Sequence, residues 1–139
     1  MREEIGVTSA FKAQLLALPG ATALETRRDG LWMLAPEIDV VAMATFMHRA
    51  EGRLSTVTGV AREDGETDLI YHYIIGRGAI NVKARTKGNG IASIANVTQS
   101  ANWIEREIHD LYSVNFVGHP DLSPLVRPVQ LPEGFFRER

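Results

Sequence analysis

The sequence has no cysteine among its 139 residues. Disulfides, thiolate nucleophiles, cysteine-ligated iron–sulfur clusters and c-type haem attachment are therefore excluded for these residues. The longest apolar run, residues 38–47, is interrupted by Asp39 and Thr45 and is well short of the ~20 residues that cross a bilayer. Residues 1–5 lack the apolar core of a signal peptide. These absences predict a cytoplasmic chain that is attached to a membrane only through a partner.

An excess of positive charge is also missing. The 15 lysines and arginines face 17 aspartates and glutamates, and the net charge is -2. Nucleic acids and anionic membranes usually bind surfaces with a basic excess, so this balance argues against both. One basic row, Lys83, Arg85 and Lys87, follows the segment with Tyr71 and Tyr73, and together they could bind single-stranded RNA. The net charge favours instead a solvated strand face, or a rim that meets an acidic partner.

What is present fits a single α+β domain, because 139 residues with 45% hydrophobic content can bury one core. The pattern predicts, in order, a helix capped by Thr8 or Ser9, strands at 21–28 and 31–34 joined by a turn at Asp29-Gly30, a helix over 36–52, and strands at 54–61, 69–75 and 80–85. Tight turns between successive strands predict a mostly antiparallel sheet of about five strands with helices packed on it. The predicted domain covers residues 1–122. Prolines at 124, 128 and 132 predict an extended tail over 123–139.

Residues 69–75 are the most strand-like segment. One face of this strand would carry Leu69, Tyr71, Tyr73 and Ile75, and the other would carry Ile70, His72 and Ile74. Both sets are largely apolar, which predicts a central strand covered on both faces. His72 is therefore expected to be a hydrogen-bonded histidine of the core or of an interface.

From Ser100 the pattern becomes helical. Its apolar stripe consists of Ile104, Ile108, Leu111 and Tyr112. Glu107 falls inside this apolar arc, with Asp110 nearly beside it, and a buried carboxylate is costly unless it is paired or hydrogen-bonded. The sequence therefore predicts partners for the two carboxylates. Candidates are Arg106, one turn before Asp110, and the distant Arg85 and Arg127.

A long motif covers this helix and the segment after it. Residues 101–112 read ANWIEREIHDLY, and residues 116–122 read FVGHPDL. A W-x-E-R-E-x-x-D helix followed by F-x-G-H-P-D-L resembles the signature of the C-subunit family of NADH:quinone oxidoreductase (complex I) and the related energy-converting nickel–iron hydrogenases. The resemblance implies an α+β domain in the hydrophilic arm of a membrane-bound oxidoreductase, with no catalysis, redox centre or other cofactor of its own. Its implied partners are chains related to the large and small subunits of nickel–iron hydrogenases, which the domain would brace.

The resemblance further implies a structural and interfacial role for the motif residues. These are Trp103, Glu105, Arg106, Glu107, Asp110, Phe116, Gly118, His119, Pro120, Asp121 and Leu122. Two features depart from the respiratory pattern: Ser113 replaces the usual glycine, and the basic L-R-K-D ending is absent. Both resemble the shorter hydrogenase-type relatives, so the choice between a respiratory and a hydrogenase complex stays open.

A function of a different class is also compatible with the motif. Glu105 and His109 are one helical turn apart, and His119 and Asp121 follow, so these four could bind a divalent metal for a stand-alone hydrolase. Their spacing does not match H-E-x-x-H. The carboxylates of the helix could also serve as general acids or bases. A catalytic pair should line a cleft, whereas Glu107 is predicted to point into packing, so a structural ion-pair network is favoured.

Overall fold

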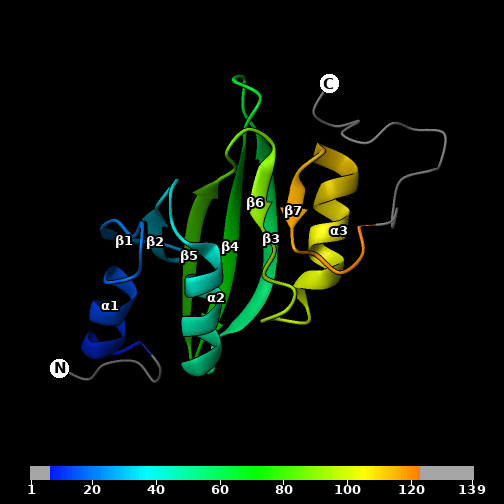
Figure 1. Ribbon diagram of the computed structural model, residues 1–139. Helices are drawn as coiled ribbons and strands as arrows, with labels where there is room; N and C mark the ends of the chain where they lie inside the picture. Colours follow the sequence, from blue (N-terminus) through cyan, green and yellow to red (C-terminus); the bar gives the residue numbers. More distant parts are fainter. Residues whose placement is uncertain (1–6, 123–139) are drawn as a thin grey trace.

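Local signals in the sequence fix where the first two helices begin. The computed structural model describes residues 7–122 (Figure 1). Helix α1 (Ser9–Leu16) follows Thr8, whose hydroxyl accepts a hydrogen bond of 3.0 Å from an N–H of the first turn. Asp39 caps α2 (Val40–Arg49) in the same way, also at 3.0 Å. Such caps satisfy N–H groups that a helix leaves free at its start. Helix α1 begins where the sequence predicts it, whereas α2 lies within the predicted 36–52 segment but begins only at Val40.

Five strands form the main sheet, in the order β1-β2-β5-β4-β3. They are β1 (Leu24–Arg27), β2 (Gly30–Leu34), β3 (Arg53–Ala61), β4 (Thr67–Ile75) and β5 (Gly78–Arg85). All neighbours pair antiparallel except β2 and β5, which run parallel. Parallel pairing is possible here because α2 and the β3–β4 hairpin form a long crossover between the two strands. The predicted α+β class and mostly antiparallel sheet are confirmed.

A second, smaller unit follows β5. It contains β6 (Gly90–Ala92), α3 (Ala101–Tyr112) and β7 (Asn115–Val117), and β6 pairs in parallel with β7. In Figure 1 this unit lies beside β3, at the end of the sheet away from α1. The predicted tail over 123–139 lies outside the described residues. Among the described residues, no helix has the length and apolar composition needed to cross a bilayer.

One face of the main sheet forms the core. On β4 this face carries Leu69, Tyr71, Tyr73 and Ile75, all buried. Side chains of all three helices belong to the same hydrophobic cluster, among them Phe11, Leu15, Met43, Met47 and Ile108. The helices therefore share one core with this face, which is the arrangement expected of a sheet with an apolar side.

The opposite face is only partly covered, and we refer to it as the open face. On β4 it carries Ile70, His72 and Ile74, each half-buried. The prediction that β4 is covered on both faces is therefore wrong for this side. His72 is nevertheless hydrogen-bonded as predicted, since one ring nitrogen lies 2.9 Å from the Thr58 hydroxyl and the other 2.7 Å from the Asn81 side-chain oxygen.

Candidate functional site

Helix α3 packs on the core through Ile104, Ile108 and Tyr112 of its predicted apolar stripe, but the glutamate on its buried side is not the predicted one. Glu105 and Ile108 are buried, about 60° apart around the helix axis, whereas Glu107 is exposed. The last turn of the helix closes on Gly59 of β3, where a Cβ atom would lie 3.2 Å from the Tyr112 ring. Because Gly59 leaves room for that ring, the helix turns Glu105 inward. The prediction of a buried, paired Glu107 is wrong, and its proposed partner Arg127 lies outside the described residues.

Glu105 is held by neutral hydrogen-bond donors. Its side chain is 0% exposed. The Ser93 hydroxyl donates to Oε1 at 2.6 Å, and the Ile94 N–H donates to Oε2 at 2.9 Å. Ser93 Oγ in turn accepts from the Ala95 N–H at 3.0 Å. These bonds tie α3 to the segment after β6. Sequence reasoning missed Ser93 and Ile94 because their loop has no periodic pattern, although a serine next to an apolar residue was the available signal.

The enclosed position changes the acidity of Glu105. Burial raises the pKa of this carboxyl to about 7, although the bonds from Ile94 and Ser93 act in the opposite direction. Burial and the nearby charge of Glu105 also raise the pKa of Tyr71 and Tyr73 above the ordinary tyrosine value. Within the described part of the chain, neither tyrosine hydroxyl has a hydrogen-bond partner. A glutamate with a pKa near neutrality is therefore enclosed between α3 and the core face of β4.

The corner after β7 closes the other side of the site. Gly118 has a φ of 89°, which favours glycine, and the His119 N–H bonds the Phe116 carbonyl at 3.1 Å. The His119 ring donates from Nε2 to the Asn102 carbonyl at 3.0 Å and accepts at Nδ1 from the Asp121 N–H at 2.9 Å. Accepting at Nδ1 requires the neutral imidazole. The 3.9 Å approach between Nε2 and Glu105 is therefore a contact of a neutral ring with the carboxyl group.

This geometry does not support the metal-dependent hydrolase. Both ring nitrogens of His119 are used in hydrogen bonds to the backbone. His109 Nδ1 lies 2.9 Å from the Val114 carbonyl, which accepts its proton. Over residues 7–122 no group of three or more His, Cys, Asp or Glu side chains could hold a metal ion. Of the four residues proposed for that site, His119 lies near the Glu105 carboxyl group and meets Asp121 through the backbone N–H of Asp121.

The remaining motif residues divide between inside and outside. Phe116 is buried, as its prediction as a core anchor requires, and so is Asp110; Leu122 packs partly on the core. Glu107, Gly118, Pro120 and Asp121 are exposed, and Arg106 is half-buried. Trp103 is 63% exposed, with the Arg106 guanidinium 5.2 Å from its ring centroid, and Val117 is 61% exposed. The motif thus has an anchored inner part and an outer part in which Trp103 and Val117 expose apolar surface among charged side chains.

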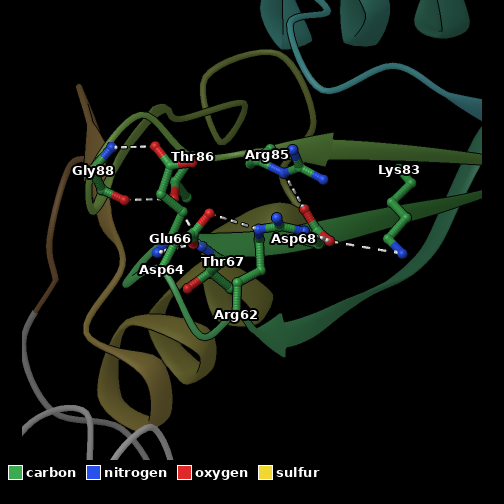
Figure 2. Close-up of polar contacts among 9 residues, drawn as sticks. All are labelled: Arg62, Asp64, Glu66, Thr67, Asp68, Lys83, Arg85, Thr86 and Gly88. Carbon is green, nitrogen blue, oxygen red and sulfur yellow. Dashed lines mark hydrogen bonds and ion pairs between the residues drawn. The ribbon is translucent and has the colours of Figure 1, made fainter.

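A second polar cluster lies at one end of the open face; it contains Lys83 and Arg85 of the predicted basic row, but its central Asp68 was not predicted. Figure 2 shows cations gathered around Asp68: Arg85 Nε at 2.8 Å, Arg62 Nη1 at 3.3 Å and Lys83 Nζ at 3.7 Å. Burial alone would raise the pKa of Asp68, but the hydrogen bonds and charges of these cations outweigh it and lower the pKa. The register of β4 and β5 puts Lys83 and Arg85 on the open face, while Tyr71 lies on the core face. The RNA-binding alternative, which needs both together, is therefore wrong.

Comparison with known families gives a match over most of the chain. The family described as "Respiratory-chain NADH dehydrogenase, 30 Kd subunit" matches residues 33–137. The C subunit of NADH-quinone oxidoreductase from Azorhizobium caulinodans is 31% identical over 121 residues, which is 79% of this chain and 57% of that protein. The C subunit from Cereibacter sphaeroides is 32% identical over 96 residues, 63% of this chain and 48% of that protein. This chain spans from about a fifth to somewhat over half of the length of the curated relatives it matches.

Two solved structures share the fold. One belongs to the membrane-bound sulfane sulfur reductase, an archaeal respiratory membrane complex, with a TM-score of 0.66 and 23% identity over 80% of this chain and 71% of that chain. The other is the trypsin-resistant fragment (1-134) of Nqo5, with a TM-score of 0.62 and 22% identity over 81% of this chain and 94% of that chain. At these identities the likeness establishes the fold.

Proposed function

The chain belongs to the respiratory-chain NADH dehydrogenase 30 kDa subunit family, and from that premise we propose that it is a non-catalytic subunit of a membrane-bound respiratory oxidoreductase. It braces other subunits of the hydrophilic arm, chains related to the large and small subunits of nickel–iron hydrogenases. It lies on the cytoplasmic side and reaches the membrane through these partners. The parent complex is either a quinone-reducing NADH dehydrogenase or a hydrogenase-type complex.

The division of the motif into an inner and an outer part carries this proposal. The Glu105 carboxylate and both ring nitrogens of His119 make hydrogen bonds to the backbone and to Ser93. These bonds fix the helix and the corner from inside. Trp103 and Val117 meanwhile leave large apolar surfaces in solvent. Exposed tryptophan next to an arginine is typical of the side chains that dominate protein–protein interfaces. A rigid support that exposes a tryptophan and a valine on its outer surface suits a subunit that positions its neighbours.

The proposal is tested by recovering the tagged chain from detergent-solubilised membranes of the organism that encodes it. We expect other subunits of one oxidoreductase to co-purify, and their identity assigns the respiratory or the hydrogenase type. Trp103→Ala should lower their recovery roughly tenfold or more, as for a central interface tryptophan. Leu16→Ala, at an exposed leucine of α1, is the matched control and should leave recovery unchanged. Recovery of the wild-type chain alone would refute the proposal, and unchanged recovery with Trp103→Ala would refute the assigned contact region.

A further inference from the structure

The open face carries a lysine set among apolar side chains. Strand register places Lys83 beside Leu34 of β2 on one side and Ile70 of β4 on the other. The adjacent row holds Asp68, whose partner in the register is Val60 of β3. Leu34 is 46% exposed and Val60 is 42% exposed, and Ile70 is half-buried. Contiguous apolar side chains left in water around a charge are a feature of interaction surfaces.

The three cations at this end of the open face are not equally engaged. Arg62, Lys83 and Arg85 face Asp68, and Arg62 also bonds Asp64 at 3.2 Å (Figure 2). Lys83 is the least engaged of the three cations. Its ammonium lies 3.7 Å from Asp68, beyond hydrogen-bonding distance, and it makes no hydrogen bond within residues 7–122. Its three donors remain available to an anion from outside.

This pattern selects one kind of occupant. A nucleic acid or an anionic lipid surface needs several available cations, whereas of the three cations around Asp68 only Lys83 makes no hydrogen bond within residues 7–122. A protein segment with a carboxylate between apolar side chains matches both the charge and its surroundings. We propose that the open face around Lys83 docks an acidic, partly apolar segment of a partner subunit, whose carboxylate pairs with Lys83. This inference rests on the proposed function, and it assigns a second contact surface apart from the motif helix.

The test compares three variants in the tagged chain purified with its complex. Lys83→Glu reverses the charge and should lower recovery of the partner roughly tenfold at low salt, since like charges at an interface repel. Lys83→Met keeps the apolar stem and should lower it less. Lys12→Glu makes the same reversal at an exposed position of α1 and should change recovery less than about twofold. Raising the salt should bring the wild type close to Lys83→Met, because salt screens the pair.

A second measurement guards against misfolding of the charge-reversal variant. A carbodiimide that joins amines to touching carboxylates should link Lys83 to an aspartate or glutamate of a partner in the wild-type complex. If the wild type recovers its partners and Lys83→Glu does so equally, this inference fails while the proposed function stands. If the wild type recovers none, both fail. Linkage of Lys83 to a second copy of this chain would also overturn the inference.

Discussion

Two carboxylates, Glu105 and Asp68, are almost equally removed from water, yet their acidities shift in opposite directions. Glu105 is 0% exposed and Asp68 is 4% exposed. Neutral donors surround Glu105, and its pKa rises to about 7. Cations surround Asp68, and its pKa falls below the ordinary value. Burial acts on both in the same sense, so the charge of the partners decides the sign of the shift.

The two carboxylates also have different structural roles. The bonds of Glu105 join α3 to the loop segment after β6, outside the main sheet. The bonds of Asp68 join β4 to its neighbour β5 and to the end of β3, all within one sheet. We therefore expect losses at Glu105 to loosen the motif unit, and losses at Asp68 to weaken one end of the sheet.

Removing the buried carboxylate should have the largest effect. Glu105→Ala leaves the Ile94 N–H and the Ser93 hydroxyl without their acceptor and opens a cavity, so we expect the free energy of unfolding to fall by about 4 kcal/mol. Chemical denaturation of the full chain measures this. Glu107→Ala, an exposed position on the same helix, should change it by less than about 0.5 kcal/mol. Equal losses at the two positions would mean that Glu105 does not anchor the helix.

The raised pKa of Glu105 predicts a stability that falls with pH. Between the ordinary value of 4.5 and about 7, the folded chain holds a proton that the unfolded chain has lost. The stabilising contribution is therefore complete below pH 4.5 and is lost as the pH rises through 7, by about 3 kcal/mol in total. Glu105→Gln cannot titrate and should lack this slope. Denaturation curves at pH 5, 6, 7 and 8 that run parallel for the two proteins would contradict the prediction.

Neutralising Asp68 should lower the free energy of unfolding by less than the loss of Glu105. The contribution of Asp68 should also depend on pH in the opposite direction. Asp68→Asn leaves Arg62, Lys83 and Arg85 without their shared anion, and we expect a loss of about 2 kcal/mol at pH 7, reduced by salt because the cations are partly exposed. The contribution of Asp68 is present above pH 3.8, the ordinary value, and is lost as the pH falls through its lowered folded pKa. Asp64→Asn, at an exposed aspartate of the same cluster, is the control. Similar losses in the free energy of unfolding for Asp68→Asn and Asp64→Asn would contradict the expectation that the buried aspartate contributes more than the exposed one.

Sequence patterns predicted the elements wherever nearby residues determine them. The cap Thr8 is an example, since its hydroxyl accepts from the N–H of Phe11, three residues ahead. The inward position of Glu105 on α3 was not predictable in the same way, because it depends on Gly59 of a distant strand making room for Tyr112. Apolar periodicity alone pointed to Glu107 and not to Glu105.

The candidate site was likewise predicted in its residues but not in its contacts. The motif includes both Glu105 and His119, yet their partners Ser93 and Asn102 are fixed by how β6 and the corner pack together. Asp68 was not singled out because its pairing with Arg85 follows from the register of two strands. Register depends on both strands and the turn between them, which single-strand patterns do not specify.

The parallel pairing of β2 with β5 has a consequence for how the chain is made. Strand β5 is the last of the five to be synthesised, yet it lies in the middle of the sheet. The Asn81 side chain even bonds the Leu31 carbonyl at 3.3 Å, across 50 residues of sequence. On the ribosome, the β1–β2 hairpin and the β3–β4 hairpin must therefore wait with unpaired edges until β5 emerges and joins them. Translation that paused before Gly78 would prolong the interval in which nascent chains can pair with each other through those edges.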